Sequence, residues 1–198
     1  MDRFEGKLTQ ATREFFGETI GNSEQLFEKL ETLTELVYAH CWHKNPVENY
    51  LMWGAYTSHP DSIAIKTTFG NLKKEFDSSI ERLNYKAGSG TGSLFKGGFF
   101  DVQYVNETHL DHTYSFYQYF STKRKYYEGE QECRFLVEIK TPSLNKPHTL
   151  PFLGLNSLDF IDEIVLNPKR SAALEQSIKK VLPQNLALKV KESIFRSD

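Results

Sequence analysis

Residues 132–140, ECRFLVEIK, carry the strongest strand signal in the chain, and the interpretation of the fold starts from them. The stretch is rich in aromatic and branched residues, which favour strands. Two acidic residues, Glu130 and Glu132, lie where the chain enters this strand. Side chains two residues apart on a strand point to the same face. The sequence therefore predicts two neighbouring carboxylates at the start of a late strand.

Neighbouring carboxylates repel each other, and this repulsion raises the pKa of one of them. A pair of this kind can transfer protons, or one carboxylate can stabilise a developing sugar cation. Arg134 is expected on the same face and is a natural partner for Glu132. The alternative is a ladder of surface ion pairs that has no catalytic role. The spacing alone leaves both interpretations open.

The segments on either side of this strand alternate between helical and strand patterns. We expect helices over 23–34, 46–58, 71–83, 113–125 and 168–182. The second of these begins with Asn45 as its cap, Pro46 in its first turn and Glu48 reaching back to the cap. We expect further strands over 36–42, 62–67, 99–105, 160–166 and 185–195.

This order, with helices mostly early and strands mostly late, predicts an α+β fold with a single mixed or mostly antiparallel sheet. We expect one domain over residues 1–198. The glycine-rich stretch AGSGTGS, at 87–93, is the best linker candidate, but it is too short and too central to divide the fold.

Composition excludes several classes of protein. The chain has 198 residues, of which 39% are hydrophobic and 25% are charged, enough apolar residues to form a core. No apolar run approaches the ~18 residues of a membrane span, and the first residues lack the pattern of a secretory leader. The formal net charge of −2 gives no sign of a nucleic-acid binder. The two cysteines form no Cys-x-x-Cys pair, so we expect free thiols, a cytoplasmic protein and no zinc ribbon.

Further groups of residues are candidates for a site. The basic run Lys123, Arg124 and Lys125 beside two tyrosines can hold a phosphate, or it can be the basic end of a helix. Trp53 and Tyr56, three apart on a helix, are either core residues or a platform for a ring.

Cys41 and His43 share one face of a strand and suggest either a Cys–His dyad or a buried thiol beside a histidine. No third or fourth zinc ligand lies at a characteristic spacing along the sequence, so we expect no metal site. His109 and His112 fall in a polar loop. The basic surplus over 168–198 is either a solvated helical face or a surface that attracts phosphate.

Several segments resemble one bacterial family when they are taken in order: CWHKNPVENYLMWGAY at 41–56, FSTKRKYYEGEQECRFLV at 120–137 and IDEIVLNP at 161–168. The chain resembles, over nearly its whole length, the family catalogued as domain of unknown function 2971. The residues that carry the resemblance are Cys41, Trp42, Glu48, Trp53, Tyr56, Lys125, Glu130, Glu132 and Arg134. The usual first strand and helix of that family are not recognised before the segment at 2–6.

The layout of that family is in turn similar to that of ADP-ribosyltransferases, which implies NAD as a substrate. By this resemblance, Glu132 or Glu130 is the late catalytic glutamate, and Trp53 or Tyr56 stacks against nicotinamide. The basic run Lys123, Arg124 and Lys125, with Arg134 beside the glutamates, then binds the nucleotide. The first ligand of NAD is expected in the opening that is not recognised here, which puts activity in doubt.

Two functions follow as hypotheses. The first is an NAD-dependent ADP-ribosyltransferase or NAD-cleaving enzyme, acting on a small-molecule nucleotide and an unidentified acceptor, with phage defence as its setting. The second is a non-catalytic binding or interaction module, in which the same glutamates and arginine form structural ion pairs and the aromatic residues form a core.

Overall fold

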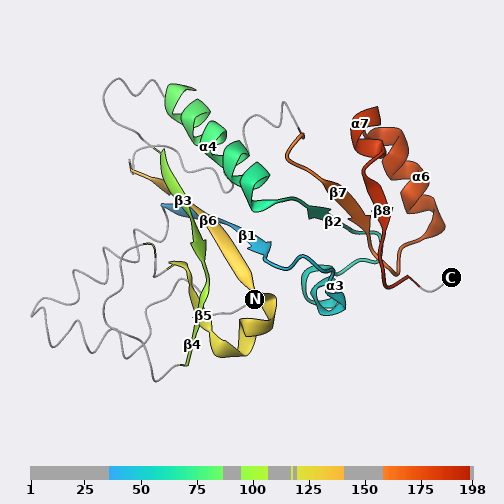
Figure 1. The fold of residues 1–198 in the computed structure, drawn as a ribbon, viewed down its shortest axis with the longest axis horizontal. Coiled ribbons are helices and arrows are strands. Elements are labelled where there is room, and N and C mark those ends of the chain that lie inside the picture. Colours follow the sequence, from blue (N-terminus) through green and yellow to red (C-terminus); the bar gives the residue numbers. More distant parts are fainter. Residues whose placement is uncertain (1–35, 87–94, 107–116, 118–119, 141–157, 197–198) are drawn as a thin grey trace, which may run out of the picture. The chain divides into compact units, whose positions relative to one another are not determined.

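The computed structural model describes residues 36–86, 95–106, 117, 120–140 and 158–196 (Figure 1). The chain divides into two compact units. The first comprises residues 1–44 and 80–151, and the second comprises 45–79 and 152–198. Each unit is therefore built from two separate segments of the chain. A single domain over residues 1–198 stays a prediction.

The first unit is organised around the strand that the sequence analysis started from, β6 (Glu132–Ile139). It lies between β1 (Val37–His43) and β3 (Phe95–Asp101), and both pairings are antiparallel. The strand predictions for 36–42 and 132–140 are confirmed. β6 therefore has a neighbouring strand on each edge, and seven of its eight residues are buried.

The two faces of β6 differ in chemistry. Phe135 lies on the apolar face and packs against Phe99 of β3, with ring centroids 4.9 Å apart. Glu132 and Arg134 lie on the other face, because side chains alternate along a strand. The register places His43 opposite Glu132 and Cys41 opposite Arg134.

A short parallel pair, β4 (Gln103–Val105) with β5 (Thr122–Arg124), follows in the first unit. The predicted strand 99–105 is thus split between two sheets. The reason is a change of partner: the N–H of Val102 donates to the carbonyl of Glu132, and the next N–H donates to the carbonyl of Ser121.

The predicted helix over 113–125 is wrong at its end, because β5 is followed by a 3-10 helix, η1 (Lys125–Glu130). The basic run therefore spans a strand and the start of a 3-10 helix and is not the end of an α-helix. Most of 107–119 lies outside the described residues.

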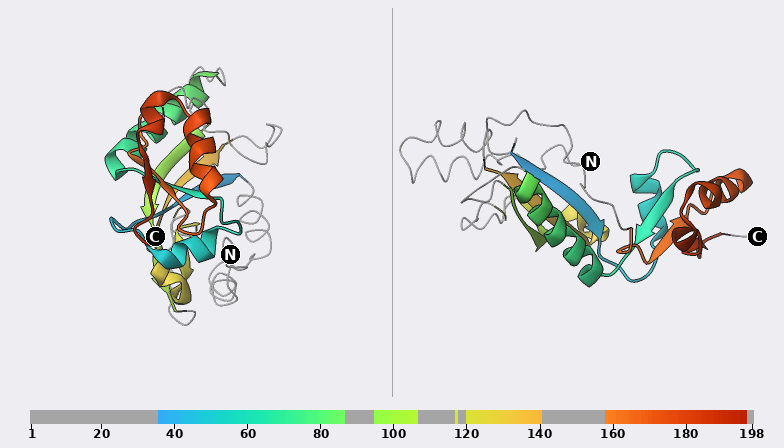
Figure 2. Two further views of the ribbon diagram at one scale, coloured as in Figure 1. Left: turned by 90° about the vertical axis from the view of Figure 1, so that its right-hand side faces the viewer. Right: turned by 90° about the horizontal axis from the view of Figure 1, so that it is seen from above.

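The second unit contains another three-stranded sheet, in the order β2 (Ile63–Lys66), β7 (Glu163–Leu166), β8 (Val190–Glu192). β2 pairs with β7 antiparallel, and β7 pairs with β8 parallel. Helices α6 (Ala172–Val181) and α7 (Gln184–Ala187) lie beside β8 (Figure 2). One core cluster of the unit is formed by Ile161, Ile164 and Leu186.

Helix α4 (Phe69–Lys86) confirms the helix predicted over 71–83. Leu72, Phe76 and Leu83 are buried along one side of it, as their spacing requires. Near its end the Asn84 side chain accepts from the N–H of Phe95 at 2.9 Å and donates to its carbonyl at 3.0 Å. The end of α4 is thereby held to the start of β3.

Helix α3 (Tyr50–Tyr56) begins later than the sequence predicts. Asn45 makes a local turn, in which its side chain accepts from the N–H of Val47, and Asn49 caps the helix instead by accepting from the N–H of Leu51. Glu48 does not reach back to a cap. Its carboxylate accepts from the indole N–H of Trp53 at 2.7 Å and from the N–H of Ile194 at 2.9 Å. The hydrogen bond from Ile194 therefore forms in place of the local capping box.

The C-terminal prediction is also corrected. Residues 185–195 were expected as a strand, but the first part forms α7, and only Val190–Glu192 is extended. The carbonyl of Pro183 accepts from the N–H groups of Leu186 and Ala187, which closes a helical turn. The buried Leu186 side chain then holds that turn in the core.

The α+β class is confirmed, but the single sheet is wrong. The described residues form two three-stranded sheets and one two-stranded pair. Five of the eight strands have only three or four residues, and such strands suffice for small separate sheets. The part of the chain described here contains no helix long and apolar enough to cross a membrane.

The helix predicted over 23–34, the glycine-rich stretch 87–93 and the pair His109 and His112 lie outside the described residues.

Candidate functional site

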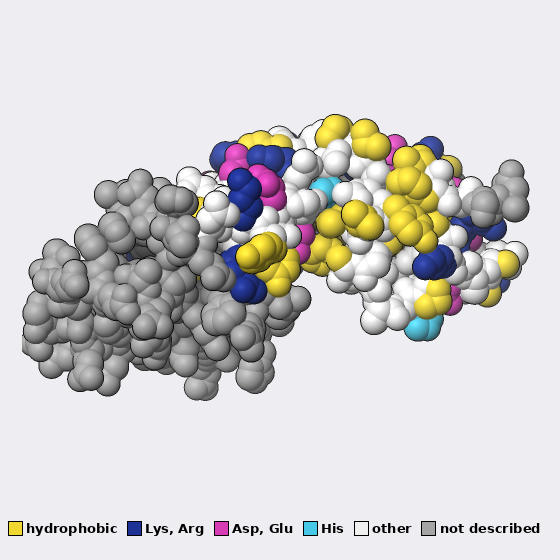
Figure 3. Space-filling view, turned by 90° about the horizontal axis from the view of Figure 1, so that it is seen from below, with side chains coloured by type: hydrophobic (Ala, Val, Ile, Leu, Met, Phe, Trp, Pro, Cys, Tyr) yellow, Lys and Arg dark blue, Asp and Glu magenta, His cyan; other side chains and the backbone are white. Residues whose placement is uncertain are grey.

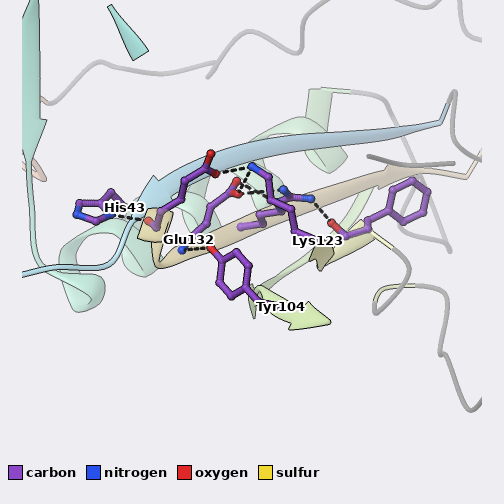
Figure 4. A network of polar contacts seen from close by, with 7 residues as sticks. His43, Tyr104, Lys123 and Glu132 are labelled. Atoms are coloured by element: carbon purple, nitrogen blue, oxygen red, sulfur yellow. Dashed lines mark hydrogen bonds and ion pairs between the residues drawn. The ribbon is translucent and has the colours of Figure 1, made fainter. Parts of the chain in front are cut away.

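Four charged side chains of the first unit meet in one buried cluster, which we call the ion quartet: Lys123, Glu130, Glu132 and Arg134 (Figure 4). Lys123 comes from β5, Glu130 from the end of η1, and the other two from β6. The quartet contains two cations and two anions, so its net charge is zero when all four are ionised. The sequence predicted every member as a site residue, and the structure brings these four together.

Glu132 is the centre of the quartet. Its Oε1 accepts from Nε of Arg134 at 3.0 Å, and its Oε2 accepts from Nη2 of Arg134 at 3.0 Å. The ammonium of Lys123 lies 3.3 Å from the same Oε2. The side chains of all three residues are at most 6% exposed. Both oxygens of the carboxylate are therefore held by cations in a site with little water.

Both cations also make contacts outside Glu132. Lys123 donates to Oε2 of Glu130, and its Nζ lies 4.9 Å from the ring centre of Tyr127. Arg134 donates through Nη1 to the carbonyl of Phe120 at 2.7 Å. Buried charges are tolerated when they are paired and hydrogen-bonded, as these two cations are.

The backbone between the two glutamates has an unusual conformation. Gln131, between them, has φ 42° and ψ 52°, a left-handed conformation that non-glycine residues seldom adopt. The N–H of Glu132 donates to the phenol oxygen of Tyr104 at 2.7 Å, and Nδ1 of His43 donates to the carbonyl of Glu130. The sequence predicted that the two glutamates share one face of a single strand. They meet at Lys123 instead because a turn joins the 3-10 helix that ends at Glu130 to the strand that begins at Glu132.

The pKa of Glu132 is lowered, so Glu132 is not the member of the pair with the raised pKa that the sequence analysis expected for one of them. Burial alone would raise the pKa. Hydrogen bonds from Arg134 and from the thiol of Cys41, together with the charges of Arg134 and Lys123, outweigh burial. Glu132 is accordingly ionised at neutral pH and is a poor general acid.

The other two members of the basic run lie outside the quartet. Arg124 is half-buried, with its guanidinium 5.8 Å from the centre of the Tyr127 ring. Lys125 is exposed in η1. The run therefore divides into one buried structural lysine and two residues that solvent reaches.

Trp53 and Tyr56 belong to the second unit, whereas the ion quartet belongs to the first. Trp53 is buried, and its indole N–H is engaged by Glu48. This environment is that of a core residue. Tyr56 is exposed.

Cys41 and His43 do share a face of β1, as predicted, and both contribute to the surroundings of the quartet. Among the described residues, no group of three or more His, Cys, Asp or Glu side chains is arranged to hold a metal ion.

The sequence analysis did not predict that Tyr104 and Cys41 contact Glu132. No local signal predicts these contacts, because Tyr104 and Cys41 come from two other strands and reach Glu132 only through the arrangement of those strands.

Tyr117 contacts the polar face of β6 farther along the strand, at Glu138. Its phenol donates to Oε2 of Glu138 at 3.1 Å, and its ring stacks on Phe100 at 4.9 Å. Burial, then the hydrogen bond to Glu138 and the negative charge of that residue, raise its pKa to about 12. A raised pKa means that folding favours the protonated phenol. Its contribution to stability is present below about pH 10 and is lost as pH rises through about 12.

We expect a tyrosinate absorbance titration to contain a late transition near pH 12 that is missing in Tyr117→Phe. The exposed Tyr85 provides the control, since Tyr85→Phe should keep the late transition. If Tyr117→Phe keeps it as well, the contact with Glu138 does not form in solution.

Comparison of the chain with protein-family models, with curated proteins and with solved structures finds no match in any of the three. The resemblance to domain of unknown function 2971, and through it to ADP-ribosyltransferases, receives no support from them.

Proposed function

We propose that the chain is a non-catalytic binding or interaction module whose first unit is held together by the ion quartet. The observation that carries this proposal is the state of Glu132: both its carboxylate oxygens are occupied by Arg134 and Lys123, and its side chain is only 4% exposed. A catalytic carboxylate needs an oxygen that can reach the reacting atoms. This glutamate is better suited to joining β6 and β5 than to meeting a substrate.

The proposal predicts how stability depends on pH. A lowered pKa means that the ionised Glu132 is favoured by folding. Its contribution is present above the ordinary value of 4.5 and is lost as pH falls through the lower pKa of the folded state. Denaturant unfolding of the wild type should therefore show decreasing stability below about pH 5. Glu132→Gln should be less stable at neutral pH and should lose part of that acid dependence.

The matched control for this experiment is Glu163→Gln, which removes a carboxylate from a more exposed ion pair with Lys66. It should leave stability nearly unchanged, since exposed pairs contribute little. NAD added to the wild type should remain intact. A Glu132→Gln variant that matches Glu163→Gln in stability at neutral pH would argue against a structural role for the quartet.

The enzyme hypothesis remains a second candidate, and Glu130 is the residue that favours it. Its side chain is 16% exposed, more than any other member of the quartet. Within the described residues, its side chain is held through Oε2 by Lys123 alone. Oε1 could accept from a sugar hydroxyl while the cation holds the carboxylate in place. The link to NAD comes only from the sequence resemblance, and family membership is part of this proposal.

For this candidate we expect the wild type to release nicotinamide from NAD, and we expect Glu130→Gln to lose that release while it remains folded. Glu128→Gln is the control, because Glu128 is an exposed acid in the same 3-10 helix. Release that survives in Glu130→Gln would remove Glu130 from the mechanism. Intact NAD with the wild type would favour the module.

A further inference from the structure

Among the described strands, β2 lies at one edge of the second sheet. In the order β2-β7-β8, the described part of the chain supplies a partner for β2 on one side only. The strand has the sequence Ile-Ala-Ile-Lys, and all four of its residues are exposed. An apolar edge strand with unpaired backbone groups is a template for another strand.

The backbone of β2 indicates which groups point outward. The carbonyl of Ser62 accepts from the N–H of Asn167, so the backbone carbonyl of Ser62 points toward β7. Backbone groups of alternate residues in an antiparallel pair point to opposite sides. Ala64 therefore faces β7, and Ile63 and Ile65 direct their N–H and C=O groups away from the sheet. Ile164, opposite Ile65, donates to the far side, to the carbonyl of Lys189, which agrees with this alternation.

The side chains of the two isoleucines extend the core. The register aligns Ile65 with Ile164 and Val190 in one row across the sheet. Ile164 is buried in the core cluster and Val190 packs against it, but Ile65 and Ile63 are each 42% exposed. The apolar row therefore stops at the open edge without a neighbour among the described strands.

Exposure alone does not distinguish this edge. Hydrophobic side chains reach the surface in several places on the face drawn in Figure 3. β2 combines exposed apolar side chains with outward peptide groups, and this combination specifies a strand as the occupant.

We propose that two copies of the chain associate by pairing β2 with β2 of the second copy, antiparallel and centred on Ala64. The segment Ile63-Ala64-Ile65 has the same sequence in both directions, which makes the edge self-complementary about a two-fold axis. This register sets Ile63 of each copy opposite Ile65 of the other, so that outward groups meet outward groups. Two three-stranded sheets then form one six-stranded sheet whose apolar row continues across the interface.

Sedimentation velocity of the full chain under reducing conditions tests the pairing. We expect the wild type to associate reversibly into dimers, and Ile65→Lys to weaken association by about tenfold or more, because a lysine at the edge disfavours pairing. Val181→Lys is the matched control, since it places the same charge at an exposed apolar residue of α6. It should dimerise like the wild type. A wild type that is monomeric at all concentrations, or equal effects of the two lysines, would overturn the proposal.

Ala64→Cys tests the register without disturbing the edge. Ala64 of the two copies would form a non-hydrogen-bonded pair, with Cα atoms about 4.5 Å apart, a separation that a disulfide can span. Oxidation should convert this variant into a covalent dimer faster than the wild type, which carries the exposed Cys41 and the buried Cys133. Crosslinking no faster than that of the wild type would exclude pairing centred on Ala64.

Discussion

Arg134→Ala is expected to lower the free energy of unfolding by about 3–5 kcal/mol, the usual loss when one partner of a buried ion pair is removed. The variant removes both hydrogen bonds that Arg134 makes to Glu132 and the one it makes to the carbonyl of Phe120. The carboxylate is left buried with Lys123 as its nearest cation, 3.3 Å away. Desolvation of this carboxylate then opposes folding without sufficient compensation.

Urea denaturation at neutral pH measures the loss. The control is Lys44→Ala, which breaks the pair of Lys44 with Asp101 at 2.8 Å, a pair whose side chains are 57% and 71% exposed. Exposed pairs contribute about 0–1 kcal/mol, so this variant should stay close to the wild type. Arg134→Lys keeps the charge but cannot reproduce the two parallel bonds, and its stability should fall between the two. If Arg134→Ala is no less stable than Lys44→Ala, the quartet is open to solvent.

Gly97→Ala is expected to destabilise the first unit by about 1–3 kcal/mol, the usual cost of forcing an extra carbon into a filled space. Gly97 lies in β3 opposite Val137 of β6. A Cβ at this position would lie 2.7 Å from the backbone carbonyl oxygen of Leu136 and 3.3 Å from the ring of Phe135. The carbonyl belongs to the central strand, so relief requires β3 to move away from β6.

The midpoint of denaturant unfolding should therefore fall for Gly97→Ala. Gly129 provides the control, since a Cβ added there meets nothing within 4 Å and Gly129→Ala should be nearly neutral. Equal midpoints for the two variants would mean that β3 lies farther from β6 than the structure places it.

The strands and helix that the sequence predicted best are those whose signal is local. β1, β2, β6 and α4 were predicted because branched and aromatic runs or a helical spacing of apolar residues occur within each segment. The pairing of Glu132 with Arg134 was also predictable, because two residues on one strand share a face whatever the strand pairs with.

The failures have one cause, which is competition from distant partners. Glu48 binds the N–H of Ile194 and does not cap its own helix. The chain changes sheets at Val102 because Glu132 and Ser121 supply the next acceptors. Leu186 is held in a helical turn by the core, although its segment has strand character.

The sequence by itself determined the α+β class, the central strand β6 and the group of charged residues around it. The tertiary structure alone decided that the strands divide among separate sheets, that Lys123 is buried between two glutamates, and that the pKa of Glu132 is lowered. The physical reason is that these interactions differ in the distance along the sequence over which they act. Backbone preference and side-chain alternation act between residues close in sequence, whereas desolvation and charge compensation depend on every neighbour that folding brings near.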